Sequence, residues 1–170
     1  FKILQKEEKV FVSFMDQVWG IVTKGDLQKA PTRMWLFGLI SLLEMQMLRI
    51  IREFYPKDSW KNLISEKRLE SASQLLSERN RRNEAIDLAD CLQFSDKVTI
   101  ICKSKKISSK FGCCSRRNLE SAFKDIRKLR DDLAHSHDII TGRWEKLGKI
   151  IESGESLLRK AEEISFAGRV

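Results

Sequence analysis

The clearest periodic pattern of apolar and polar positions lies between Arg116 and Asp138. Apolar side chains recur there at spacings of three and four residues, at Leu119, Ala122, Ile126, Leu129 and Leu133. This spacing predicts an amphipathic helix with one face against a core. Asn118 is a candidate cap at the start of the helix, and Glu120 in its first turn suits the positive end of the helix dipole.

The longest apolar segment runs from Pro31 to Tyr55 and predicts a helix of about 37 Å. Proline suits the first turn of a helix, and Pro56 marks its end. The uncharged run from Met34 to Leu43 has only ten residues, which is too short for a membrane span. We therefore expect no membrane partner. We expect a helix buried between the rest of a bundle and the N-terminal β segment, or against a second subunit.

Three shorter helices are predicted near residues 65–80, 84–91 and 95–103, and a last helix from Gly142 to Ile164. Glycine is a poor helix former. Gly148 and Gly154 therefore weaken the last helix unless another helix comes close to it there.

The segment from Lys9 to Asp26 has a different pattern. Two runs rich in β-branched and aromatic residues are separated by Asp16 and Gln17, which predicts a β-hairpin. The predicted fold is mainly α, with an antiparallel helical bundle over residues 31–170 and a short hairpin within residues 1–30.

The net charge of +8 over 170 residues adds information on partners. It suggests an anionic partner such as RNA, and a lysine-rich surface without a ligand explains it equally well. The cysteines form no CxxC pair, so we expect reduced thiols in a cytoplasmic protein and no metal site; they are Cys91, Cys102, Cys113 and Cys114.

The densest candidate chemistry lies late in the Arg116–Asp138 helix, where both histidines of the chain follow Arg130 and Asp131. At about 100° per residue, Asp131 and His135 share a helix face, so the carboxylate would orient the imidazole. Histidine gains and loses a proton near neutral pH. With His137 as a spare acid or base, one helix would hold imidazoles, a fixed guanidinium and an orienting carboxylate together.

The same residues resemble a known motif, in the run Arg130-Asp131-Asp132-Leu133-Ala134-His135. Proteins of the HEPN superfamily carry an arginine, a polar residue after it, and a histidine after four to six intervening residues. His137 also satisfies this spacing, although His135 fits better. The resemblance implies a helical bundle that dimerises and, in many members, a metal-independent RNase with the motifs of both subunits at the interface. We therefore expect a homodimeric endoribonuclease that requires no cofactor.

A basic segment precedes the motif helix. Lys103 to Arg117 has six basic residues and no acidic one, and its serines and glycine predict a loop or a short broken helix. Beside an RNase site this segment would hold a phosphate backbone. A solvated loop without a ligand is an equal alternative. The RNA-binding candidates are Lys103, Lys105, Lys106, Lys110, Arg116 and Arg117.

The hairpin region resembles the second half of a CBS motif, in the run Gly20-Ile21-Val22-Thr23-Lys24-Gly25-Asp26. Thr23 and Asp26 match the positions that contact the ribose and phosphate of adenine nucleotides in CBS pairs. The resemblance implies an adenine-nucleotide site. The alternative is that both residues cap the next helix.

Two other functions are compatible with the sequence. One is a non-catalytic bundle that dimerises or binds nucleic acid or nucleotide, since arginine–aspartate pairs on exposed helices are common and contribute little. The other is a regulator in which an upstream CBS module senses a nucleotide and controls the helical domain.

Overall fold

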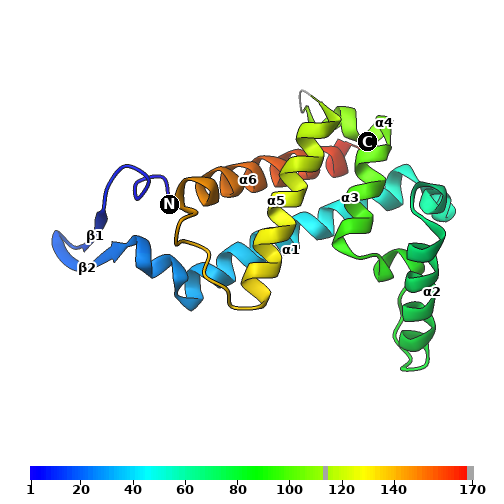
Figure 1. Ribbon diagram of the computed structural model, residues 1–170, viewed down its shortest axis with the longest axis horizontal. Helices are drawn as coiled ribbons and strands as arrows, with labels where there is room; N and C mark the ends of the chain where they lie inside the picture. Colours follow the sequence, from blue (N-terminus) through cyan, green and yellow to red (C-terminus); the bar gives the residue numbers. More distant parts are fainter. Residues whose placement is uncertain (113–114, 168–170) are drawn as a thin grey trace.

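The computed structural model describes residues 1–112 and 115–167 and is mainly helical, with a small two-stranded antiparallel sheet near the N-terminus (Figure 1). The predicted mainly α class with an N-terminal hairpin is thus confirmed. With η for a 3-10 helix, the elements are β1 (Lys9–Phe14), β2 (Gln17–Thr23), η1 (Lys24–Gln28), α1 (Ala30–Phe54), η2 (Pro56–Leu63), α2 (Glu66–Asn80), η3 (Leu88–Cys91), α3 (Phe94–Lys103), α4 (Lys105–Ser108), η4 (Ser109–Phe111), α5 (Arg116–Ala134) and α6 (Trp144–Ala167).

The core forms where α1, α3, α5 and α6 pack together. In α5 the predicted apolar stripe is buried except for Ala122, which is partly buried. Phe123, which the predicted stripe did not include, has no exposed surface. The Phe123 ring meets Phe94 of α3 and Phe111 of η4 edge to face, with centroids 6.3 Å and 6.1 Å away. The buried residues of α5 are Leu119, Phe123, Ile126, Leu129 and Leu133.

The helices do not all alternate in direction. Leu39 of α1 faces Gly154, and Gln46 of α1 accepts a hydrogen bond from Ser165 at 3.0 Å, so α1 and α6 run the same way. The predicted antiparallel packing therefore does not extend to this pair. Between α5 and α6 the order of the contacts is opposed, because Asp132 pairs with Arg143 just before α6 and Asp125 pairs with Lys146 within it, although α5 crosses α1 and α6 (Figure 1).

Both ends of α5 differ from the prediction. The cap is Ser115, whose hydroxyl accepts from the backbone N–H of Asn118 at 3.1 Å, so Asn118 is the third residue of the helix and does not cap it. The helix ends at Ala134 and does not continue to Asp138. Ser136 has φ +56°, a left-handed conformation that cannot continue a right-handed helix.

The predicted helix near residues 84–91 is wrong, because residues 84–87 lie in no helix and only η3 follows them. Asp87 and Asp90 cap η3 reciprocally, and both carboxylates bind Arg52 of α1 at 2.8 Å. These contacts hold an irregular chain against α1 in place of a helix. The helices predicted near residues 65–80 and 95–103 match α2 and α3, and the basic segment contains the short helices α4 and η4.

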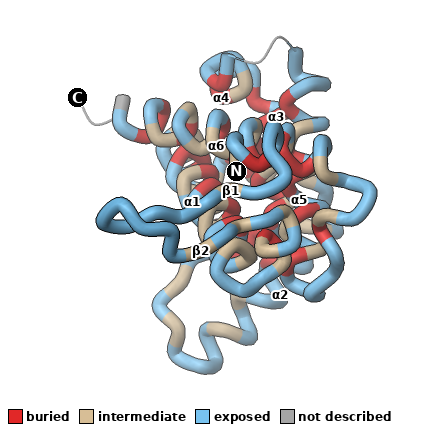
Figure 2. Tube along the Cα trace, turned by 90° about the vertical axis from the view of Figure 1, so that its left-hand side faces the viewer, coloured by how far each residue is buried: buried red, intermediate tan, exposed pale blue. Residues whose placement is uncertain are grey.

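The hairpin projects from the helices and is exposed on both faces (Figures 1 and 2). Its apolar side chains do not cover α1, which was expected to be buried. A contiguous face of α1 is therefore exposed, although the opposite face lies in the core. The large exposed side chains are Phe11, Val12, Phe14, Met15, Val18, Trp19 and Ile21 in the hairpin, and Met34, Trp35, Phe37, Leu42 and Met45 in α1.

By length and composition, α1 is the one helix within the described residues that would suffice to cross a membrane. A core helix passes the same test, and 33% of its apolar window is buried inside the chain. Its buried residues are Leu36, Ile40, Leu43, Met47, Ile50 and Ile51.

Gly154→Ala is expected to raise the free energy of unfolding by about 0.5–1 kcal/mol, because alanine is the better helix former. Its Cβ would meet Leu39 Cδ2 at 3.6 Å and Ile126 Cδ1 at 4.0 Å, which are ordinary contacts. Gly154→Leu should instead lower the free energy by about 1–3 kcal/mol, since the close approach of α1 leaves no room. Urea unfolding followed by circular dichroism measures both, and equal effects would contradict the packing of α1 on α6.

Candidate active site

The carboxyl end of α5 is held by an arginine from the start of α1. Arg33 donates to the backbone carbonyls of Asp132 at 3.2 Å, Leu133 at 3.1 Å and His137 at 3.0 Å. The Asp132 and Leu133 carbonyls lie at the negative end of the helix dipole, where no residue within the helix can donate to them. The backbone N–H groups of His137 and Ser136, just beyond the helix, donate to them as well. A guanidinium with several donors in one plane satisfies them together. The turn that carries the histidines is therefore fixed to α1.

Asp132 orients one imidazole of the pair. Its Oδ1 lies 3.2 Å from Nδ1 of His137, and its Oδ2 accepts from Arg143 at 2.9 Å. With Nδ1 bound to the carboxylate, Nε2 of His137 is the nitrogen left to exchange a proton with a ligand. The ring of His135 lies beside it, with centroids 5.8 Å apart and planes tilted by 31°. The geometry places an oriented imidazole next to a second one.

His137 lines an open groove between the end of α5 and the start of α1. The groove has a volume of about 600 Å³ and is lined by Gln28, Ala30, Arg33, Met34, Ser136, His137 and Asp138. That volume falls in the range of small-molecule sites. The imidazole is mostly exposed, with 62% of its side-chain surface accessible, so a large substrate has direct access to it.

A capped turn supports the other side of the groove. Asp138 Oδ1 accepts from the backbone N–H groups of Ile140 at 2.8 Å and Thr141 at 3.0 Å, and also from the Gln28 side-chain amide of η1. Asp138 Oδ2 accepts from the Thr141 hydroxyl. The Thr141 hydroxyl and amide, with the Ile140 amide, lower the pKa of Asp138 to about 2. Gly142 follows with φ +66°, a conformation suited to glycine.

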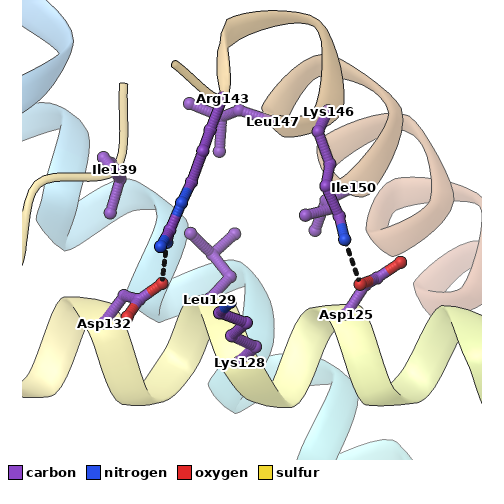
Figure 3. Close-up of a pocket in the computed structure, with 9 residues that line it drawn as sticks. All are labelled: Asp125, Lys128, Leu129, Asp132, Ile139, Arg143, Lys146, Leu147 and Ile150. Atoms are coloured by element: carbon purple, nitrogen blue, oxygen red, sulfur yellow. Dashed lines mark hydrogen bonds and ion pairs between the residues drawn. The ribbon is translucent and has the colours of Figure 1, made fainter. Parts of the chain in front are cut away.

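Behind Asp132 lies a small cavity of about 80 Å³ between α5 and α6 (Figure 3). Two ion pairs stand at its sides, Asp132 with Arg143 and Asp125 with Lys146 at 2.8 Å. Its floor is apolar, from Leu129, Ile139, Leu147 and Ile150. Because only 16% of the Asp132 side chain is exposed, water screens this pair less than a pair at the surface.

The structure places the predicted catalytic residues in two locations. His135 and His137 are at the end of α5, whereas Arg130 and Asp131 line a separate cavity toward α2 and α3. Asp131 pairs with Arg130 at 3.5 Å. No side-chain bond between Asp131 and His135 is found in the described part of the chain, where the orienting carboxylate is Asp132. His137 lies beyond the end of α5 at Ala134, so it is not on the same helix as Arg130.

The basic segment is partly used within the chain. Lys103 donates to the Leu63 carbonyl at 2.8 Å, Lys110 lies 5.8 Å from the centroid of the Phe54 ring, and Arg116 pairs with Glu120 at 2.7 Å. The remaining three basic residues, Lys105, Lys106 and Arg117, are exposed. The prediction that the segment binds RNA stays open.

Thr23 and Asp26 bind each other. Asp26 Oδ2 accepts from the Thr23 N–H at 2.6 Å and from its hydroxyl at 2.9 Å, and Asp26 Oδ1 pairs with Lys29 at 2.6 Å. Lys29 and the Thr23 groups lower the pKa of Asp26 to about 2. The two residues thus cap η1, which was the alternative to a nucleotide site.

Two buried cysteines are described, Cys91 and Cys102, and burial raises the pKa of the Cys91 thiol. Cys113 and Cys114 lie outside the described residues. Among the described residues no three histidine, cysteine, aspartate or glutamate side chains are grouped as metal ligands.

The sequence analysis missed the contributions of Asp132, Arg33 and Arg143. Asp132 lies inside the motif, but a continuous helix predicts Asp131 as the partner of His135. Arg33 and Arg143 have no sequence signal, because one lies about 100 residues before the histidines and the other follows an irregular turn.

Comparisons with protein-family models, with curated proteins and with solved structures find no match to this chain.

The stabilising effect of Asp138 should disappear in acid. A carboxyl whose folded-state pKa is lowered stabilises the fold above its ordinary pKa of 3.8, and loses that effect as the pH falls toward 2. We expect Asp138→Asn to have a lower Tm than the wild type at neutral pH, and the difference to shrink strongly near pH 2, where the carboxyl is about half protonated. Thermal unfolding at several pH values measures the difference, and a difference as large at pH 2 as at neutral pH would contradict a role for the charge.

Proposed function

We propose that the protein is a metal-independent endoribonuclease of HEPN type that acts as a homodimer. The observation that supports this most is the oriented imidazole of His137, held by Asp132 at 3.2 Å beside the ring of His135 on an open groove. Two imidazoles at this separation supply a base and an acid to one phosphodiester.

The proposed reaction uses only proton transfers. One imidazole takes the proton of a ribose 2′-hydroxyl, and the 2′-oxygen attacks the adjacent phosphorus. The bond from phosphorus to the 5′-oxygen breaks, and the second, protonated imidazole donates its proton to that oxygen. The products are a 2′,3′-cyclic phosphate and a 5′-hydroxyl. Asp132 keeps His137 in the tautomer that leaves Nε2 facing the substrate.

The proposed dimer would bring an arginine to the imidazoles, which one chain alone does not. Arg130, the candidate for stabilising the phosphorane, lies in another cavity of the same chain. A twofold interface would let Arg130 of one subunit serve the imidazoles of the other. The exposed face of α1 favours such an interface because it reaches the groove. Met34, with 73% of its surface exposed, belongs to both.

Cleavage of single-stranded RNA in EDTA tests the activity. We expect wild-type cleavage, about 10²-fold or greater loss in His137→Gln, and a large loss in Arg130→Gln and Asp132→Asn. Asp125→Asn is the matched control, because Asp125 is on the same helix and also pairs with an α6 cation. Cleavage abolished by EDTA, or unchanged in His137→Gln, would refute the mechanism.

A second candidate is a dimerisation module without catalysis, favoured by the apolar surface of α1 and the hairpin. In that case the pairs around Asp132 serve stability alone.

A CBS-type response to adenine nucleotide is also retained as a proposal. Nucleotide binding would require Asp26 to give up its contacts with Thr23 and Lys29 and to contact the nucleotide instead.

Leu42→Glu should convert the dimer to a monomer, because it places a charge on the α1 face. Light scattering after gel filtration measures the mass. Leu75→Glu on α2 is the control, since Leu75 is also an exposed leucine, at 40% against 50% for Leu42. A wild-type monomer, or a Leu42→Glu dimer, would refute an interface through α1.

A further inference from the structure

One apolar face of α1 is left uncovered by the residues that the structure describes. Between Met34 and Leu43 the helix has no charged side chain, yet its large exposed side chains keep between 43% and 73% of their surface accessible. The opposite face of α1 lies in the core, so the exposed face is held as a rigid surface. Its large apolar side chains are Met34, Trp35, Phe37, Leu42 and Met45.

Gly38 lies at the centre of this face. At about 100° per residue, Met34 and Leu42 lie about 40° to either side of it around the helix axis, and Met45 lies about 20° away. Within residues 1–112 and 115–167, no atom beyond the neighbouring backbone of α1 lies within 4 Å of the place that a Cβ of Gly38 would occupy. The space above Gly38 is therefore open.

Within a single chain, Gly38 only weakens α1. Glycine destabilises the interior of a helix relative to alanine, and Gly38 has no positive φ that would require it. Glycine does allow another backbone to come close, because the distance between two packed helices depends on the side chains at their contact. The open space at Gly38, with Met34 and Leu42 on either side, has the shape that a second helix would fill.

The size of the face matches one half of a homodimer interface. At about 200 Å² for a fully exposed large apolar side chain, the five exposed side chains present about 500 Å². A standard interface covers about 800 Å² of each partner, and about 65% of a homodimer interface is apolar. The apolar area that such an interface needs is therefore close to the area that α1 exposes.

The face is also complementary to itself. If two antiparallel copies of α1 are related by a twofold axis at Gly38, Met34 of each copy lies against Leu42 of the other. The symmetry repeats this contact on both sides of the axis. Gly38 then lies against Gly38, where no side chain keeps the two backbones apart.

We propose that two copies of this chain associate through α1, with the two helices antiparallel and crossing at Gly38. This inference rests on the homodimer of the proposed function and names the contact that forms it. Met34 lies one turn before Gly38 and lines the imidazole groove. The crossing would cover Met34 in both subunits, so both grooves would open beside the twofold axis. Leu42 of the partner subunit would then complete the groove wall at Met34.

Sedimentation equilibrium measures the dimer Kd without RNA. Gly38→Leu should raise this Kd about tenfold or more, because a bulky side chain would hold the helices apart at their crossing. Gly38→Ala should raise it less, since it adds one methyl group. In the separate chain both side chains would enter open space. Circular dichroism of dilute, monomeric protein should therefore show both variants folded, with a Tm at least equal to that of the wild type.

Ser71→Leu is the matched control for added bulk. It places a leucine at an exposed position of α2, so its dimer Kd should stay within about twofold of the wild type, as for most surface substitutions. Trp19→Glu tests the hairpin, the other large apolar surface, and should leave the dimer intact.

The outcomes separate this contact from the proposed nuclease. A dimer that persists in Gly38→Leu but is lost in Trp19→Glu would place the interface on the hairpin and overturn the crossing. A wild-type monomer would overturn it as well. A dimer that Gly38→Leu dissociates, but that cleaves no RNA, would refute the nuclease and support the crossing.

Discussion

The guanidinium of Arg33 on the carboxyl end of α5 is the interaction on which the geometry of the imidazole groove depends. It joins the first turn of α1 to the last turn of α5 through three carbonyls, those of Asp132, Leu133 and His137. The bond to Asp132 fixes the backbone of the residue whose carboxylate orients His137. The bond to His137 fixes the backbone that carries the ring. One side chain therefore sets both partners of the His137–Asp132 contact, and it does so from a helix whose other face lies in the core.

Periodicity was sufficient to predict α1, α5 and α6, because each buries a stripe that recurs every three or four residues. It failed at the ends of α5. Serine and asparagine both cap helices well, so the choice between Ser115 and Asn118 is made by where the chain enters the bundle. No glycine or proline marks the end at Ala134, which coincides with the contacts that Arg33 makes. Helix direction failed for a similar reason, since the parallel packing of α1 and α6 follows from contacts such as Gln46 with Ser165.

In the candidate site, too, one part could be predicted from the sequence and another part depends on tertiary contacts. Its chemistry was visible in the sequence, because two histidines lie close to an arginine and two aspartates. Its geometry was not. On an ideal helix Asp131 and His135 share a face, but the left-handed Ser136 turns the chain and brings His137 to Asp132. The change from Asp131 to Asp132 moves the orienting carboxylate by about 100° around α5. It therefore changes which cavity each aspartate lines.

The groove of a single chain is open to water on one side, which limits the electrostatic help it gives to a transition state. The exposed face of α1 begins at the rim of that groove, at Met34, and continues through Trp35, Phe37, Leu42 and Met45. Burial of this face in the proposed dimer would exclude water next to His137 and bring a second set of α5 cations toward it. Association and acid–base chemistry would thus be coupled by geometry, because the apolar surface that favours the dimer adjoins the imidazole that would act in it.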